Sequence, residues 1–177
     1  KGNIMNCLNN KVFFLGVLLM APVWSVYSDD VEQNELVTSD NENESAETNL
    51  FGNSIDLSDK NLTAIPAWVT KKTDLEKLIF EKNKLKNIPS SIANLRYLTH
   101  LNLSNNDLTE LSASIGSLKR LETLDCVNNF LETIAPEIGN LRRLITLNLK
   151  YNNFSVFPHE LTQLKGLRYF YLHANCI

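Results

Sequence analysis

Apolar residues recur along residues 54–177 at a fixed spacing of 23 positions. Four apolar columns share this period, and they hold Leu75, Leu98, Leu121, Leu144 and Leu167; Leu78, Leu101, Leu124, Leu147 and Phe170; Phe80, Leu103, Cys126, Leu149 and Leu172; and Leu85, Leu108, Leu131, Phe154 and Ile177. An asparagine column has the same period and holds Asn83, Asn106, Asn129, Asn152 and Asn175. Five coincident columns indicate an internal repeat whose units stack and bury a common core.

Each unit contains a short stretch in which polar and apolar residues alternate, as Leu101, Asn102 and Leu103 do. A period of two is typical of a strand with one buried face. The pattern predicts parallel strands at Leu78–Phe80, Leu101–Leu103, Leu124–Cys126, Leu147–Leu149 and Phe170–Leu172. A degenerate earlier unit, with Ile55 and Leu57 in register and Lys60 in place of the asparagine, brings the expected sheet to about six strands.

The asparagine column follows each strand at the point where the chain must turn away. Buried backbone groups at such a turn need hydrogen-bond partners, and a side-chain amide can both donate and accept. We therefore expect these asparagines to form a structural ladder. The second half of each unit should return along the opposite, convex side, where it closes the core with Ile92, Ile115, Ile138 and Leu161 and with Leu95, Leu118, Leu141 and Leu164.

The segments LRYLTHLNLSNNDLTEL and LRRLITLNLKYNNFSVFP resemble the leucine-rich-repeat pattern. The period, together with the tails IPSSIANL and APEIGNL, is similar to the bacterial and plant-type repeats with an LPxxIGxL second half. The resemblance covers about 120 residues. It implies an α/β repeat solenoid, a right-handed horseshoe whose concave side is a parallel sheet. The first unit departs from the pattern at Gly52 and Lys72, as expected for a degenerate N-terminal cap, and Ser112 and Ala135 replace the usual proline.

Residues 1–28 have the layout of a secretory signal peptide. Met5 is the expected initiator, an apolar run of 13 residues spans 12–24, and small or apolar residues precede a cut ahead of Asp29. The run is shorter than the roughly 20 residues of a membrane span, although an uncleaved anchor is the alternative. The sequence thus predicts a secreted or extracytoplasmic protein, in the periplasm or at the cell surface, with no stable membrane span after signal removal.

Residues 29–53 form a second, acidic segment with eight carboxylates and no Lys or Arg. So few apolar residues and so many like charges predict disorder, and a solvated spacer is the leading interpretation over an acidic interaction tail. Residues 55–177 hold 15 basic and 12 acidic residues, a net charge of 15 − 12 = +3. That balance is too weak to indicate nucleic-acid binding.

No combination of residues indicates catalysis. His100 and His173 fall three repeats apart, roughly 15 Å by strand spacing, so they cannot share a metal ion. The chain has no nucleophile-elbow sequence and no phosphate-binding glycine loop, so we expect no enzyme, no cofactor and no metal. Cys126 fills a leucine position as a small hydrophobe. It lies two repeats from Cys176 in a different column, so we expect no disulfide between the two.

Partner binding is the function that remains, and the concave face is where such solenoids usually bind. The expected binding residues on this face are Phe130, Tyr151, Tyr169, Tyr171 and Val127. Exposed aromatic residues are enriched in interface hot spots. Shielding of the last strand is an equally good interpretation of Tyr169 and Tyr171. The sequence therefore predicts a non-enzymatic protein–protein interaction module; the alternatives are a structural or self-associating repeat protein, or a truncated fragment of a longer leucine-rich-repeat receptor or effector.

Two further surface features accompany the repeats. A basic column holds Arg96, Lys119, Arg142 and Lys165, with Arg120 and Arg143 adjacent. Solvated charge is its leading interpretation, and a docking strip for an acidic partner, including the chain's own acidic segment, is the alternative. The last predicted strand is followed by no capping element in the sequence, so its edge predicts weak homo-association.

Overall fold

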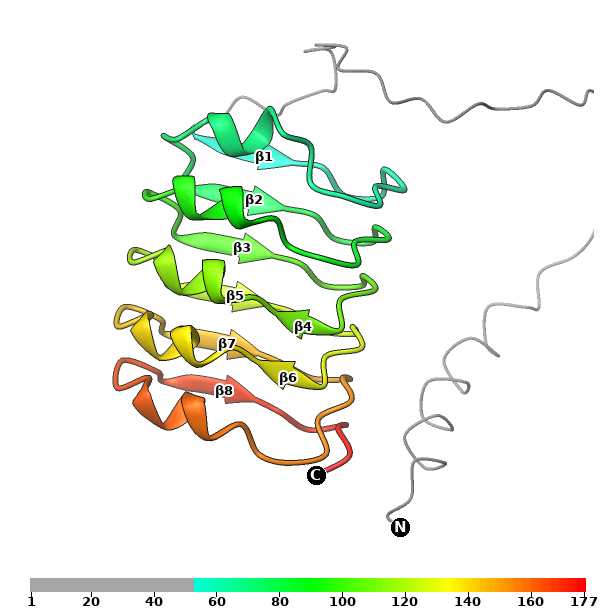
Figure 1. The fold of residues 1–177 in the computed structure, drawn as a ribbon, viewed down its shortest axis with the longest axis vertical. Helices are drawn as coiled ribbons and strands as arrows, with labels where there is room; N and C mark the ends of the chain where they lie inside the picture. Colours follow the sequence, from blue (N-terminus) through cyan, green and yellow to red (C-terminus); the bar gives the residue numbers. More distant parts are fainter. Residues whose placement is uncertain (1–52) are drawn as a thin grey trace, which may run out of the picture.

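The computed structural model describes residues 53–177 as a regular stack of repeats (Figure 1). The predicted signal peptide and all but the last residue of the acidic segment lie outside the described residues. One sheet of six parallel strands has the order β1-β2-β3-β5-β7-β8. Its strands are β1 (Ser54–Asp56), β2 (Lys77–Ile79), β3 (His100–Asn102), β5 (Thr123–Asp125), β7 (Thr146–Asn148) and β8 (Tyr169–Tyr171). The solenoid and the six-stranded sheet confirm the fold expected from the repeats.

Neighbouring strands pair in the register that the 23-residue period predicts. Leu78 lies beside Leu101, and Leu101 beside Leu124. Each strand begins and ends one residue earlier than predicted from the sequence. The reason is visible at Phe80, whose carbonyl accepts hydrogen bonds from the side chains of Asn83 and Asn106 and so does not continue the strand ladder.

The convex side is built from short 3-10 helices (Figure 1). They are η2 (Val69–Lys71), η3 (Ser90–Asn94), η4 (Ala113–Ser117), η5 (Pro136–Asn140) and η6 (His159–Gln163). Two short strands, β4 (Glu110–Leu111) and β6 (Thr133–Ile134), pair in parallel before η4 and η5. A 23-residue coil leaves room for little more than one helical turn, so the helical layer of residues 53–177 is 3-10 throughout.

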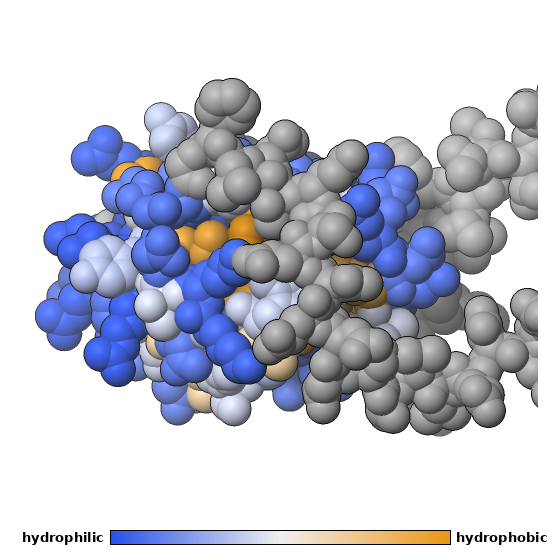
Figure 2. Space-filling model, turned by 90° about the horizontal axis from the view of Figure 1, so that it is seen from above, coloured by the Kyte–Doolittle hydropathy of each residue, from blue (hydrophilic) through white to orange (hydrophobic). Residues whose placement is uncertain are grey.

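A single hydrophobic core runs the length of the stack. The predicted apolar columns fill it from the sheet side, and Ile92, Ile115, Ile138 and Leu161 close it from the convex side. Viewed along the stack from the β1 end, hydrophobic residues are visible near the middle of the uncovered face, with hydrophilic residues around them (Figure 2). Because each repeat covers the apolar faces of its neighbours, stability is shared along the stack.

The asparagine ladder joins each repeat to the one before it. The Nδ2 group of Asn106 donates to the carbonyls of Phe80 at 2.8 Å and Leu103 at 3.1 Å, and its Oδ1 accepts from the amide of Leu85 at 3.0 Å. Asn83, Asn129, Asn152 and Asn175 repeat this arrangement one period apart. Every buried side-chain nitrogen and oxygen in residues 53–177 has a hydrogen-bond partner. The ladder thus satisfies the backbone groups that the turns leave unpaired.

The residue before each ladder position adopts a left-handed backbone. The φ angles of this column are positive, at Asp59, Lys82, Asn105, Asn128, Tyr151 and Ala174. Asparagine tolerates this conformation, whereas a bulky residue such as tyrosine seldom adopts it. The φ of 54° at Tyr151 therefore costs free energy in the folded state.

Candidate protein-binding surface

The concave face is formed by the strand residues whose side chains point away from the core. At the β1 to β7 strands these side chains are mostly small or polar, including Ser54, Thr123 and Thr146. At β8 they are Tyr169 and Tyr171. On the concave face, the large exposed aromatic side chains therefore lie at the β8 end.

Tyr169 and Tyr171 lie on one strand and share one face, because side chains two residues apart point to the same side. Both are exposed, with 57% of the Tyr169 side chain accessible. Lys150 of the preceding repeat places its Nζ over the Tyr171 ring, 4.6 Å from the ring centroid. This cation–π contact favours one orientation of the ring, and Tyr171 remains 38% exposed.

Tyr151 lies in the turn after β7 and is exposed to 39%. Its ring meets His173 edge to face, with 6.4 Å between the centroids. The pairs Tyr151–His173 and Lys150–Tyr171 connect the same two repeats, so three of the predicted binding residues and these two polar side chains form one surface. We name Lys150, Tyr151, Tyr169, Tyr171 and His173 the aromatic cluster.

The two other predicted binding residues belong to the repeat before the aromatic cluster. Val127 is half-buried beyond β5, and its amide donates to Oδ1 of Asp125 at 3.0 Å. Phe130 lies past the ladder residue Asn129, outside the strands, and is 41% exposed. Its amide donates to the carbonyl of Leu108 at 2.8 Å. Val127 thus follows β5 closely, whereas Phe130 lies in the loop that leaves the sheet.

A second row of polar residues, which was not predicted from the sequence, crosses the concave face. Oδ1 of Asn102 accepts from the amide and the hydroxyl of Ser104 at 2.9 Å and 2.6 Å. Asp56 and Ser58 form the same motif in the first repeat. This row could have been predicted from the sequence, because Asp or Asn stands two residues before Ser at positions that differ by a multiple of 23. Such residues close a local turn with their own backbone. These side chains are used internally, so the middle of the concave face is less free to bind than the β8 end.

Residues 53–177 contain no group of three or more His, Cys, Asp or Glu side chains that could hold a metal ion. Cys126 is a free thiol within the core, so it is not joined to Cys176. Burial, and secondarily the charge of Asp125, raises the pKa of the Cys126 thiol well above its ordinary value of 9.0. A buried, protonated thiol is a poor nucleophile, so Cys126 acts as a packing residue.

These features define a solenoid of short parallel repeats with a structural asparagine ladder and a concave surface. The sequence profile described as "Leucine-rich repeat region" matches residues 74–176. The chain belongs to the leucine-rich repeat family. No curated protein matches the chain significantly. Members of this family generally serve in protein interaction rather than catalysis.

Solved structures with the same fold include both bacterial and eukaryotic proteins. A leucine-rich-repeat protein of Leptospira interrogans is 25% identical, with a TM-score of 0.55 over 71% of this chain and 44% of that protein. The plant peptide hormone receptor RGFR1, in complex with RGF2, is 30% identical, with a TM-score of 0.59 over 69% of this chain and 20% of the receptor. Toll, in the Toll–Spatzle complex of Drosophila, is 27% identical, with a TM-score of 0.60 over 64% of this chain and 17% of that chain. The chain thus spans less than half of each of these three proteins.

The leucine-rich-repeat ectodomain of the receptor kinase SOBIR1 from Arabidopsis thaliana is 28% identical. The TM-score is 0.58, and the match covers 68% of each chain. None of the helices in residues 53–177 has the length and apolar character that a membrane crossing requires.

Proposed function

We propose that this chain is an exported, non-enzymatic module that binds a protein partner through the β8 end of its concave face. The observation that carries the proposal is the aromatic cluster. Three exposed tyrosines share one surface there with Lys150 and His173. Tyrosine offers a large, rigid contact area at a small cost in conformational entropy, and it is enriched in interface hot spots.

Two similar structures support a role in binding a protein. The RGFR1 structure contains RGF2 and the Toll structure contains Spatzle. Both proteins are longer than this chain, so the comparison supports the kind of partner and not its identity. The absence of a metal-binding group from residues 53–177 gives no support to metal-dependent catalysis there.

A set of alanine substitutions tests the binding surface. We expect replacement of Phe130, Tyr151, Tyr169 and Tyr171 by alanine to weaken binding of a partner captured from candidate extracts. Loss of a hot-spot residue typically costs at least about 2 kcal/mol. A control replaces Tyr97, which is exposed outside the aromatic cluster. Normal affinity in the folded quadruple variant, measured by titration calorimetry, would refute the proposed surface.

Export is proposed from the sequence of residues 1–28, and the SOBIR1 match is to an ectodomain. The mature chain should then begin at or near Asp29. N-terminal sequencing of protein recovered from the medium or periplasm tests this expectation. Recovery only as an intact, membrane-embedded chain would contradict it and favour an anchor.

Self-association through the β8 edge is a second candidate function. In residues 53–177, β8 pairs with β7 on one side and is the outermost strand of the sheet. Val156 and Ile177, on either side of β8 in the sequence, are exposed. Phe157 packs edge to face on Phe170, with 6.3 Å between the ring centroids. Exposed apolar side chains grouped at this end favour contact with a second copy. Sedimentation velocity over a hundredfold concentration range should show a rising weight-average mass, and a constant monomer mass would exclude this function.

A further inference from the structure

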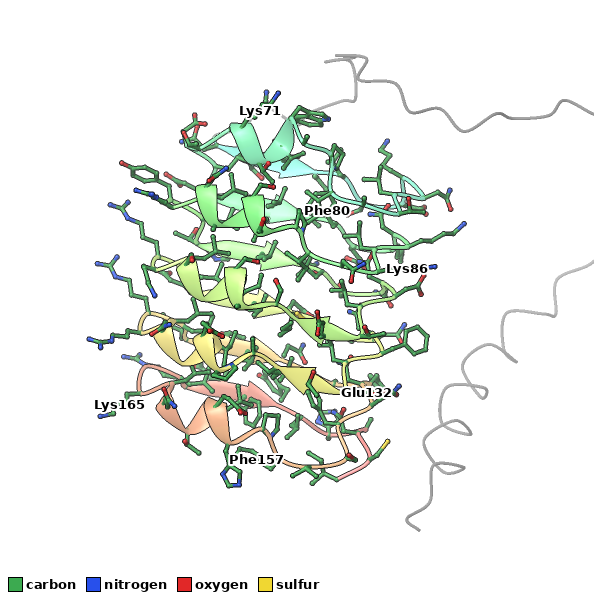
Figure 3. All side chains as sticks on the ribbon, viewed as in Figure 1. Lys71, Phe80, Lys86, Glu132, Phe157 and Lys165 are labelled. Carbon is green, nitrogen blue, oxygen red and sulfur yellow. The ribbon has the colours of Figure 1, made fainter. Side chains whose placement is uncertain are left out.

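One edge of the solenoid carries a row of cations. The loops that precede the strands, residues 96–99, 119–122, 142–145 and 165–168, contain seven basic residues and one acidic residue, Glu122. We name these seven the basic flank: Arg96, Lys119, Arg120, Arg142, Arg143, Lys165 and Arg168. All seven are exposed. In Figure 3, Lys165 marks this edge, and nitrogen-tipped side chains project from it along the stack.

The charge of the basic flank is not neutralised by the repeat domain. Within residues 53–177, none of the seven cations lies within the 4.0 Å of a salt bridge to a carboxylate. The Nζ of Lys119 donates to the carbonyl of Gly116 at 2.6 Å, and Arg120 stacks over Tyr97, 4.5 Å from the ring centroid. Both contacts hold a cation in place without cancelling its charge. Successive repeats therefore present aligned positive charges to solvent.

The chain enters the repeat domain at this same edge. The carbonyl of Asn53 accepts from the amides of Glu76 at 2.7 Å and Lys77 at 3.1 Å. At the other end of the sheet, the carbonyl of Ile145 accepts in the same way from Arg168 and Tyr169. Asn53 thus occupies the register position of the flank loops, two strand steps before the loop of Arg96, and the loop that holds Asp74 and Glu76 lies between them.

The acidic segment has a charge spacing that suits this row. Asp40, Glu42 and Glu44 alternate with polar residues, so in an extended chain all three side chains point to one side. They span four residues, about 13 Å at ~3.3 Å per residue. From Arg96 to Lys165 there are three inter-strand steps, about 14 Å at ~4.8 Å per step. The nine residues from Glu44 to Asn53 reach about 30 Å, which is enough to lay the acidic residues along the flank.

We propose that the basic flank is a docking surface for an extended acidic peptide, and that its occupant is the segment around Asp40–Glu44 of the same chain. Each exposed ion pair contributes little, but several pairs act together and the tether supplies a high effective concentration. The docked segment competes with any acidic partner that approaches this edge. The docking is sensitive to salt, because exposed charges are screened. It is independent of the concave face.

The test is a competition experiment on the full chain. The probe is a fluorescein-labelled peptide of residues 38–48, whose binding is followed by fluorescence anisotropy at low ionic strength. In the D40N/E42Q/E44Q chain the flank is vacated, so the peptide should bind at least about threefold more tightly than to the unaltered chain. In the R96Q/K119Q/R142Q chain peptide binding should be lost. The difference in peptide affinity between the D40N/E42Q/E44Q chain and the unaltered chain should disappear in 0.5 M salt. At that concentration exposed charges interact over only about 3–5 Å.

A matched control separates docking from net charge. The E110Q/E132Q/E137Q chain removes the same number of carboxylates from exposed positions outside the flank, and it should bind the peptide as the unaltered chain does. If the unaltered and D40N/E42Q/E44Q chains bind the peptide with equal affinity, the chain's own segment does not occupy the basic flank, and the proposed docking is overturned. The flank would then be open to acidic partners from other molecules. Unchanged peptide binding by the R96Q/K119Q/R142Q chain would overturn the docking surface itself.

Discussion

The side chain of Asn152 reaches the carbonyl of Cys126, 26 positions earlier, at 2.9 Å. Its Oδ1 also accepts from the amide of Leu131 at 3.0 Å. One side chain therefore closes the turn of its own repeat and fixes the loop of the repeat before it. The same relationship recurs along the described stack and identifies the ladder as the main polar element of the fold.

Loss of a ladder residue should destabilise the domain. We expect Asn106→Ala to lower the free energy of unfolding by roughly 1–3 kcal/mol, because it leaves buried backbone groups without partners. Chemical denaturation followed by circular dichroism measures the change. Asn94→Ala, at an exposed position, is the control and should alter stability little. An unchanged midpoint for Asn106→Ala would count against the role of the ladder.

The fold was predictable from sequence because the period of 23 reports which positions face the core. Leu78, Leu101 and Leu124 lie in one buried row as the columns required. The strand ends were displaced by one residue because carbonyls such as that of Phe80 bond to ladder side chains, a competition that apolar patterning does not encode.

The candidate surface was predictable only in part. Exposure of Tyr169 and Tyr171 followed from their alternation on a strand. Lys150 pairs with Tyr171, and Tyr151 with His173, through side chains of neighbouring repeats. These contacts depend on side-chain rotamers, which the repeat spacing does not determine. Phe130 shows the same limit, since its place beyond Asn129 depends on the path of the turn.

Two glycines in equivalent helices should respond differently to alanine. A Cβ at Gly116 would overlap the backbone carbonyl of Glu137, which cannot move aside easily. A Cβ at Gly139 would lie 2.5 Å from Oε1 of Gln163, the far end of a flexible side chain. Gly116→Ala should cost about 1–3 kcal/mol through overpacking. Gly139→Ala serves as the matched comparison, and equal melting temperatures for the two variants would contradict the packing argument.

The left-handed backbone at Tyr151 predicts that a substitution at this position can raise stability while it weakens binding. Asparagine adopts this conformation more readily, so Tyr151→Asn should raise the free energy of unfolding by up to about 1 kcal/mol. The same variant should weaken partner binding if the aromatic cluster is the binding surface. Lys82→Asn relieves an equivalent φ of 56° away from the cluster, and it should stabilise without affecting binding. Calorimetric melting of both variants checks the first expectation; a fall in stability for both would exclude it.

The buried thiol makes stability depend on alkaline pH. Because burial raises the Cys126 pKa in the folded chain, the folded state keeps its proton while the unfolded state releases it above about pH 9. The free energy of unfolding should therefore fall as pH rises past that value, by at most about 1.4 kcal/mol per pH unit from this group. Below that range the contribution is constant. Urea denaturation of the unaltered chain and of Cys126→Ala at pH 7 and pH 10 isolates the effect, and parallel pH dependences would disprove it.

The ladder has a direction, because each asparagine serves the repeat that precedes it. The loop of the repeat that carries Lys60 is held by Asn83, whose Oδ1 accepts from the amides of Lys60 and Leu62 at 3.1 Å and 2.9 Å. The loop of that repeat is therefore held although Lys60 stands at its own ladder position. During synthesis from the N-terminus, each coil is locked only when the next one has left the ribosome. We accordingly expect vectorial folding, in which the most recently made repeat is always the loosest.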